Sequence, residues 1–478
     1  MLPAELLIDY WWGIAAMVFS SLSFLFWFLP FFLSVYYLAP DKYKNLCLFG
    51  FSVAFYAFGT IEKPYYILLV LLTALINYAL AICISRFSGL KGVFLTLGLI
   101  LDFGVLFVFK YLDFILENLK LIPGFPQISG LNLVMPIGIS FYTFQIASYL
   151  VDVYRGDIPA EKSLLKLSTY MMMFPKLTMG PITRYGRIEN GLSSRTHSRK
   201  LFADGVVDFV IGLGLKVLLA NRIGVLWSDV CMLGFESVSV RLAWLGIFAY
   251  SMQIYFDFYG YSLMAVGLGK MIGFRLPQNF RHPYLSRSMT EFWRRWHITL
   301  GAWFKDYIYI PLGGNRRGRF RTLFNLAVVW MFTACWHGSG WNFIIWGLFL
   351  FLIITVEKAG LLRILNKIPI IGHIYMTLLI PLSWLIFATE SPKSLLNYLK
   401  RLVGIGGISV YANDYKNYSV AFYILLAVGL LFCTRIPAAV FDSLRKTPAV
   451  YPILLAVFGA SVFFIYKGMN DPFLYFRF

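Results

Sequence analysis

Long apolar runs constrain the fold of this chain more than any other feature of its sequence. Residues 64–85, 92–109, 163–181 and 451–466 approach or reach the roughly 20 residues that a helix needs to cross a bilayer. Hydrophobic residues make up 59% of the 478 residues and charged residues only 14%, which is more apolar surface than one soluble core can bury. The sequence therefore predicts an all-α polytopic membrane protein.

Several of these runs are interrupted by proline and glycine. Residues 135–140 read "MPIGIS" and residues 174–181 read "FPKLTMGP". Irregular backbone at membrane depth is tolerated only where protein or a cavity surrounds it. Of about thirteen apolar candidates, we expect about ten to twelve to be transmembrane helices, with re-entrant or interfacial helices among the rest.

The basic charge of the chain lies in short segments between apolar helices. The net charge is +19, but no continuous basic module of the kind that binds nucleic acid is present in the sequence. From residue 275 to residue 321, basic residues far outnumber Glu291 and Asp306. The positive-inside rule predicts that this segment faces the cytoplasm, together with the basic loop at residues 184–200.

The cysteines and the N-terminus carry little information about function. The five cysteines are dispersed and form neither a disulfide framework nor a metal-ligand spacing, so we expect no metal site. The first residues carry acids rather than a basic n-region, so we expect no cleaved signal peptide. Without an internal repeat or a soluble module, the chain is predicted to form one membrane body.

His337 is the first candidate functional residue, because an ionisable group is costly inside an apolar helix. It lies in "FTACWHGSGWNFIIWG", residues 332–347. A core histidine bonded to a neighbouring carbonyl is the alternative, and the sequence does not separate the two. Cys335 is not expected to be a nucleophile, since residues two apart do not face each other on a helix.

Three polar residues in "SMQIYFDFYGYS", residues 251–262, share one helix face. Gln253, Asp257 and Tyr261 recur every four residues. A hydrogen-bonded network between helices is a more economical interpretation than a catalytic acid. Asp102 and Lys216 are lone charges in other apolar runs.

The stretch "TEFWRRWHITLGAWF", residues 290–304, places arginines and a histidine among aromatic residues. Spacings of three and four predict one helix with a shared face, made of Trp293, Trp296, His297, Leu300 and Phe304. The arginines would point elsewhere or snorkel to the membrane edge. On composition alone, an interfacial anchor is favoured over an active site.

Seven stretches then occur together in a specific order. They are "MVFSSLSFLFWFLP" from Met17, "MPIGISFYTF" from Met135, "VDVYRGDIPA" from Val151, "QIYFDFYGYS" from Gln253, "MTEFWRRWHITLGAWFKDYIYIPLGGNR" from Met289, "CWHGSGWNFIIWG" from Cys335 and "PFLYFRF" from Pro472. In this combination the chain resembles the membrane-bound O-acyltransferase (MBOAT) family, and within it the AlgI-type branch of polysaccharide O-acetyltransferase subunits.

The resemblance implies a ring of helices around a central tunnel, with the acyl donor entering from the cytoplasm and the acceptor from the opposite face. It covers residues 17–478 as a single MBOAT membrane domain and leaves residues 1–16 as an N-terminal extension. His337 matches the family's essential intramembrane histidine, and His297 matches the second one. Lys176 and Leu263 stand where related chains often have His and Asp.

Acetyl transfer from a thioester to a hydroxyl needs a base near neutral pKa, which imidazole supplies. We expect His337 to be that base and His297 to orient the donor or hydrogen-bond its carbonyl. We expect the phosphates of coenzyme A to be bound by arginines, with two tryptophans completing the donor site: Arg294, Arg295, Arg316, Arg317, Trp293 and Trp296. Gln253, Asp257, Tyr261, Trp336 and Asn342 would line or brace the tunnel.

The expected function is therefore that of a multi-pass inner-membrane O-acetyltransferase. It would take acetyl from cytoplasmic acetyl-CoA for O-acetylation of an exported, alginate-like polysaccharide, with a periplasmic partner transferase and without a metal. Peptidoglycan O-acetylation and D-alanyl transfer to teichoic acid from a carrier protein are alternatives with the same fold. A proton-coupled transporter or channel, using His337 and Asp257, and a scaffold subunit are alternatives of other classes.

Overall fold

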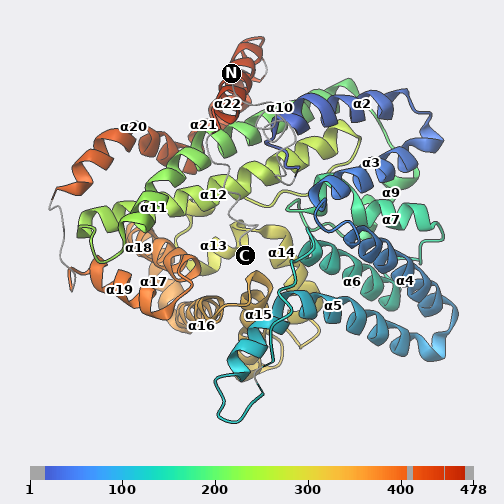
Figure 1. Cartoon of the computed structure of the whole chain (residues 1–478), viewed down its shortest axis with the longest axis horizontal. Helices are drawn as coiled ribbons and strands as arrows, with labels where there is room; N and C mark the ends of the chain where they lie inside the picture. The colour runs from blue at the N-terminus through green and yellow to red at the C-terminus, as the bar shows by residue number, and fades with distance from the viewer. Residues whose placement is uncertain (1–16, 127, 406–412, 446, 469–478) are drawn as a thin grey trace. The chain divides into compact units, whose positions relative to one another are not determined.

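The computed structural model describes residues 17–126, 128–405, 413–445 and 447–468, and this part of the chain contains helices and no strands (Figure 1). The expected N-terminal extension, residues 1–16, lies outside the described residues. The chain divides into two compact units. The first is Met1–Val206 with Ala265–Leu276, and the second is Val207–Met264 with Pro277–Phe478.

The first unit holds the N-terminal helices. They are η1 (Phe24–Phe28), α2 (Leu29–Leu38), η2 (Asp41–Tyr43), α3 (Lys44–Gly59), α4 (Tyr66–Arg86), η3 (Ser88–Leu90), α5 (Lys91–Leu119), α6 (Ile139–Arg155), α7 (Leu164–Met172), α8 (Phe174–Leu177) and α9 (Tyr185–Ser193). Helices α4, α5, α6 and α7 pack on one another, and α6 is almost wholly buried. By contrast, α4 and α5 expose large apolar side chains such as Leu68 and Ile100. This is the pattern of helices that face lipid.

The two interrupted runs of the sequence meet inside this unit. Gly138 has a φ of +73°, and a Cβ atom there would lie 2.3 Å from the carbonyl oxygen of Leu177. Between α7 and α8 the chain breaks at Met173, which is itself buried. The glycine thus permits a close approach of two backbone segments. The break between α7 and α8 is buried in protein, as irregular backbone at membrane depth requires, whereas Met135, Ile137 and Gly138 are only half-buried.

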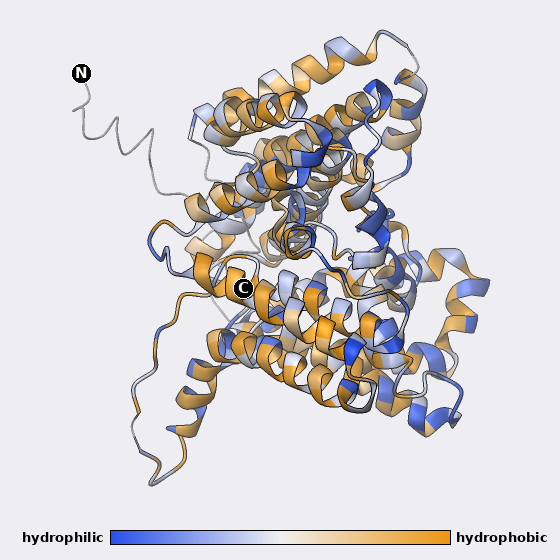
Figure 2. Cartoon of the chain, turned by 90° about the vertical axis from the view of Figure 1, so that its right-hand side faces the viewer, coloured by the Kyte–Doolittle hydropathy of each residue, from blue (hydrophilic) through white to orange (hydrophobic). Residues whose placement is uncertain are grey.

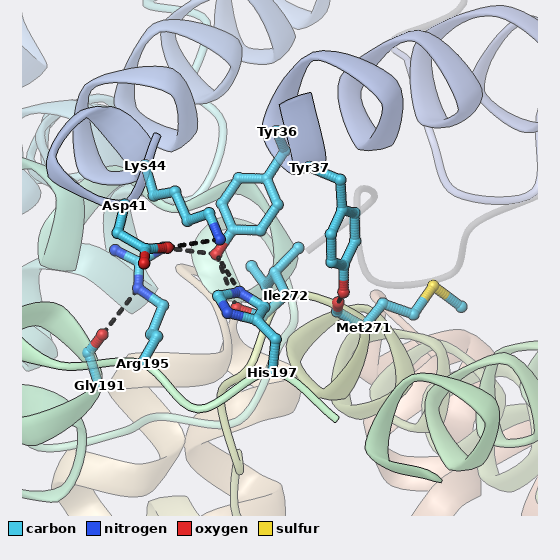
Figure 3. Close-up of polar contacts among 9 residues, drawn as sticks. All are labelled: Tyr36, Tyr37, Asp41, Lys44, Gly191, Arg195, His197, Met271 and Ile272. Carbon is cyan, nitrogen blue, oxygen red and sulfur yellow. Dashed lines mark hydrogen bonds and ion pairs between the residues drawn. The ribbon is translucent and has the colours of Figure 1, made fainter. Parts of the chain in front are cut away.

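A polar cluster joins three segments of the first unit (Figure 3). The Tyr36 hydroxyl on α2 donates to the carbonyl of Ile272 at 2.9 Å and accepts from the Arg195 guanidinium at 2.8 Å. His197 Nε2 lies 3.1 Å from the same hydroxyl. Because a hydroxyl has one proton and two lone pairs, this arrangement fits a neutral imidazole that donates from Nε2. Arg195 also donates to the carbonyl of Gly191 at 2.7 Å.

This cluster predicts a pH dependence of stability. Burial lowers the pKa of His197, the charges of Lys44 and Arg195 lower it further, and Asp41 opposes them. As the pH falls, the His197 imidazole therefore becomes protonated in the unfolded chain before it does in the folded protein. Its contribution to the free energy of unfolding is complete above a pH of about 6.5 and is lost as the pH falls below that value. Replacing His197→Gln should reduce the loss of melting temperature between about pH 7 and about pH 5 by about 1–2 °C. Thermal unfolding in nanodiscs measures this difference, and parallel losses in the two proteins would show that His197 does not contribute.

The second unit holds the remaining elements, except residues 199–206 and 265–271, which are parts of two of these helices but belong to the first unit. Helix α10 (Arg199–Gly214) enters it, followed by η4 (Leu215–Ala220), α11 (Asn221–Leu233), α12 (Val240–Met271), η5 (Pro283–Leu285), α13 (Met289–Arg295), α14 (Ile298–Phe304), η6 (Lys305–Tyr309), α15 (Gly318–His337), α16 (Trp341–Val356), η7 (Glu357–Leu361), α17 (Leu362–Lys367), α18 (Pro369–Ala388), α19 (Pro392–Leu402), α20 (Asp414–Cys433), α21 (Ile436–Leu444) and α22 (Val450–Tyr466). Helix α16 packs between α15 and α18, and α13 lies against α16. The core of the unit is aromatic, with Trp346 and Trp384 fully buried.

Six helical segments in the described residues are long and apolar enough to cross a membrane. They are Tyr66–Arg86, Ser88–Leu119, Arg199–Leu233, Trp341–Lys367, Pro369–Ala388 and Asp414–Cys433, and two shorter apolar helices are Phe24–Leu38 and Val450–Tyr466. Hydrophobic residues dominate the long helices in Figure 2. The prediction of an all-α polytopic membrane protein is confirmed. The count of ten to twelve spans and the ring around a tunnel remain predictions.

Candidate active site

His337 is the last residue of α15. The helix ends there because Gly338 is extended, with φ −172° and ψ 174°. A Cβ atom at Gly338 would lie 2.0 Å from the ring of Phe343, so glycine is required at this position by space rather than by backbone conformation. The imidazole is 5% exposed and packs edge-on against Trp346 and Phe387, with ring centroids 5.0 and 5.3 Å away.

His297 lies at a break between two short helices, so the prediction of one continuous helix over residues 290–304 was wrong. Helix α13 ends at Arg295, Trp296 is extended with φ −101° and ψ 132°, and α14 begins at Ile298. His297 itself has the left-handed conformation, with φ +43° and ψ 52°. This conformation is costly for a residue with a Cβ atom, so surrounding contacts must hold it.

Asn279 supplies those contacts from outside the aromatic stretch. Its backbone carbonyl accepts from the Ile298 amide at 2.9 Å, and its side-chain oxygen accepts from the Thr299 hydroxyl at 2.6 Å. Its amide nitrogen donates to Ser262 on α12 at 3.1 Å. Asn279 therefore satisfies the amide and hydroxyl groups that the helix break leaves open. Asn279 was not predicted as a site residue, since an asparagine in a loop carries no distinctive signal.

The two histidines meet at one tryptophan. The ring centroid of Trp336 lies 5.6 Å from that of His297 and 4.8 Å from that of His337. Phe258 of α12 covers His297 at 4.8 Å. His297 is 1% exposed, and neither of its ring nitrogens bonds to another residue that the structure describes. Most buried polar groups bond to protein or to ordered water, so the ring nitrogens of His297 are a candidate point of contact for a substrate or a water molecule. The structure thus brings together two imidazoles that are distant in sequence.

Asn342 braces the segment that follows His337. It lies in the first turn of α16, and its side-chain amide donates to the carbonyl of Phe387 at 2.8 Å. One turn along, the Trp346 indole donates to Ser383 at 3.0 Å. These two bonds join α16 to α18 beside His337.

Trp293 and Trp296 pack into the aromatic core of the second unit. Trp293 contacts the rings of Trp330 and Trp346 at 5.1 and 5.5 Å, and Trp296 contacts that of Trp384 at 4.8 Å. The two tryptophans of the expected donor site therefore pack α13 and the residue after it against α15, α16 and α18.

The expected donor-binding arginines lie in different settings. Arg295 forms an ion pair with Glu291 at 2.5 Å, one turn earlier on α13. Arg294 is exposed and lines a cavity of about 330 Å³, together with Arg287 and Asn366. The hydroxyl residues Ser288 and Thr290 and the acid Glu291 complete this lining.

Arg316 and Arg317 do not line this cavity. Both are exposed in the segment between η6 and α15. Of the four expected arginines, only Arg294 is among the residues that line this cavity. Arg287, which was not among the expected residues, lines the same cavity.

The polar face of α12 is directed at neighbouring helices. Asp257 forms an ion pair with Lys216 of η4 at 2.6 Å, and Lys216 also donates to Asn221 at 2.8 Å. Gln253 lies against α11, where a Cβ atom at Gly224 would come within 2.3 Å of its amide nitrogen. Tyr261 is fully buried one turn beyond Asp257.

Two glycines allow this close packing. A Cβ atom at Gly212 of α10 would lie 2.5 Å from the carbonyl oxygen of Gly260, and a Cβ atom at Gly260 would lie 2.6 Å from that of Gly212. Small residues at helix crossings of this kind bring backbones close together in membranes. Lys216 and Asp257 are each within one turn of this crossing.

No group of three potential metal-ligating side chains occurs among the residues that the structure describes. The features that stand out in this site are imidazole and guanidinium groups.

Comparison with known proteins assigns these features to a family. The sequence model of the membrane-bound O-acyltransferase family matches residues 154–399, which include both histidines, α13 and the whole of α12. The chain belongs to this family. MBOAT proteins are acyltransferases, so the predictions of the family and of the enzyme class are confirmed, and this chain is a multi-pass membrane acyltransferase.

Several curated MBOAT proteins resemble this chain over most of their length. A probable alginate O-acetylase AlgI of Azotobacter vinelandii is 41% identical over 78% of this chain and 76% of its own. A probable alginate O-acetylase AlgI of Pseudomonas putida is 35% identical over 97% of this chain and 100% of its own. A peptidoglycan O-acetyltransferase of Helicobacter pylori is 30% identical over 97% of this chain and 98% of its own.

Proposed function

We propose that this MBOAT protein is an O-acetyltransferase that takes acetyl groups from cytoplasmic acetyl-CoA. It passes them across the inner membrane to O-acetylate an exported, alginate-like polysaccharide, together with a periplasmic partner transferase. The observation that carries this proposal is the contact of His297 and His337 with the ring of Trp336 in a buried, aromatic site. The relatives named alginate O-acetylase support the choice of acceptor.

The two histidines divide the chemistry between them. His337 removes the proton of the acceptor hydroxyl while its oxygen attacks the thioester carbonyl carbon. The carbon–sulfur bond then breaks, the acetyl group remains on the acceptor oxygen, and coenzyme A leaves as the thiolate, which takes up the proton. His297, as a neutral imidazole, donates a hydrogen bond to the carbonyl oxygen as negative charge develops there. Surrounding aromatic rings exclude water that would otherwise hydrolyse the thioester.

Phosphate recognition by the donor site falls to Arg294 and Arg287. Both residues line the polar cavity beside α13, and neither forms an ion pair with a residue that the structure describes. Guanidinium binds phosphate through paired hydrogen bonds. Arg295, by contrast, is already engaged by Glu291.

The test is turnover of radiolabelled acetyl-CoA by the purified protein in nanodiscs, with the candidate partner and polysaccharide present. The variant Arg287→Glu/Arg294→Glu should bind coenzyme A at least about tenfold more weakly, because two attractive charges become repulsive. The charge-matched variant Arg316→Glu/Arg317→Glu should bind it normally. If the wild-type protein neither turned over acetyl-CoA nor bound coenzyme A, acetyl-CoA would be refuted as the donor.

Peptidoglycan is the second candidate acceptor. The Helicobacter pylori relative that bears this name aligns with nearly the whole chain, so the overall architecture does not discriminate between the acceptors. Supplying alginate-like polymer and peptidoglycan fragments in the same assay separates them, since label should accumulate on only one.

A further inference from the structure

Glu357 is a buried carboxylate that the reaction described above does not use. It is the first residue of η7, directly after α16, and it is 0% exposed. Its two oxygens accept four hydrogen bonds. They come from the Met289 amide at 2.6 Å, the Thr290 amide at 2.8 Å, the Thr290 hydroxyl at 2.6 Å and the Tyr375 hydroxyl at 3.2 Å.

This set of donors requires a carboxylate. An ionised Glu presents only acceptors on both oxygens, whereas a Gln of the same shape turns one of those positions into a donor. Each oxygen of Glu357 accepts from one backbone amide. A Gln here would therefore set an NH₂ group against one of the two backbone N–H groups, and that amide would stay buried without an acceptor.

Three of the four bonds end on the first turn of α13. Met289 and Thr290 are its first two residues, and the Ser288 side chain accepts from the Glu291 amide at 3.1 Å. A helix of 7 residues is too short to be stable by itself, so its position depends on the groups that hold its ends. Asn279 holds the segment after its C-terminal end, and Glu357 holds its N-terminal end.

We propose that Glu357 is a positioning residue for the acyltransferase reaction. By fixing the start of α13 against η7, it sets the position of Arg294 on that helix and, through the break after Arg295, the left-handed backbone of His297. The inference rests on the proposed function insofar as His297 and Arg294 act on the donor. The claim that Glu357 fixes the backbone from α13 to the start of α14 can be tested without any acyl donor.

The first test is hydrogen–deuterium exchange of Glu357→Gln in nanodiscs, beside Glu390→Gln as a control at an exposed carboxylate. The Glu357→Gln substitution should accelerate exchange at least about tenfold at the amides of Met289 and Thr290, and the increase should extend to Ile298 and Thr299. An increase confined to the first turn of α13, or none, would overturn the proposal. This readout does not depend on which substrate the enzyme uses.

The second test is acetyl transfer at saturating donor. Displacement of His297 should lower kcat about 10- to 100-fold in Glu357→Gln, with no change in Glu390→Gln. An unchanged kcat in Glu357→Gln would overturn the proposal. If the wild-type protein transfers no acetyl group, the proposed function fails and the exchange measurement alone decides whether Glu357 positions His297.

A milder variant covers the case in which Glu357→Gln does not fold. Thr290→Val removes one of the four donors at nearly constant volume and should lower kcat a few-fold, with faster exchange over the same amides. Where Glu357→Gln does fold, a double-mutant cycle should show that Thr290→Val adds little to it, because both changes act through one contact. Full additivity would show that the two residues act separately.

Discussion

Replacing His337→Ala should lower the rate of acetyl transfer by about 10²- to 10⁴-fold, which is the usual contribution of a general base. In the proposed mechanism the imidazole at the end of α15, which packs among the rings of Trp336, Trp346 and Phe387, removes the acceptor proton. Single-turnover transfer of radiolabelled acetyl in nanodiscs measures this loss separately from donor binding, which should change little.

His373→Ala is the matched control for this experiment. His373 is exposed on α18, and its side chain has no part in the site. The control should transfer acetyl at the wild-type rate. A folded His337→Ala protein that retained wild-type transfer would eliminate His337 as the base.

Breaking the Lys216–Asp257 ion pair should destabilise the protein by about 3 kcal/mol or more, because it leaves a buried charge without its partner. The two side chains are 0% and 4% exposed. Asp257→Asn keeps the shape of the side chain but removes its charge. We expect a marked fall in melting temperature and a much smaller effect for Asp41→Asn, whose partner Lys44 is 2.7 Å away but whose own side chain is 92% exposed.

The double variant Lys216→Met/Asp257→Leu tests the reason for that loss. Replacing both charges with apolar groups removes the buried charge as well as the bond, so the double variant should regain most of the stability that Asp257→Asn loses. Thermal unfolding of the three proteins in the same nanodiscs is the measurement. A double variant less stable than Asp257→Asn would show that the ion pair itself stabilises the fold.

The sequence was sufficient to predict those features that depend on local composition. The apolar runs predicted a polytopic helical protein, and the cost of an imidazole in such a run singled out His337. It also marked Lys216 and Asp257 as isolated charges. Their pairing was not predicted, because it depends on how closely η4 approaches α12, and that approach is set by Gly212 and Gly260 on two different helices.

The helix break at His297 could not be predicted either, because it also depends on contacts with a distant part of the chain. Spacings of three and four over residues 290–304 fit a continuous helix, and nothing in that stretch forbids one. The competing geometry comes from Asn279, whose bonds to Ile298 and Thr299 are available only once the chain has folded.

Of the surroundings of Arg294 and Arg295, the sequence could have predicted one part, the ion pair of Arg295. Glu291 precedes Arg295 by four residues, a spacing at which opposite charges pair on a helix. That spacing could have predicted the ion pair of Arg295 with Glu291. The cavity beside Arg294 could not have been foreseen, since Asn366 reaches it from α17, far along the chain.

The left-handed backbone of His297 bears on how members of this family are judged from sequence alone. Two residues outside the aromatic stretch bond to its two ends. Glu357, well after the stretch in sequence, bonds to the start of α13, and Asn279, before the stretch, bonds to the start of α14. A chain could keep every letter of "WRRWH" and still lack either of these residues. If Asn279 and Glu357 position His297 as proposed, such a chain would match the motif and yet present its histidine differently. The groups that fix this site then come from three separate parts of the chain: the asparagine, the aromatic block and the distant glutamate.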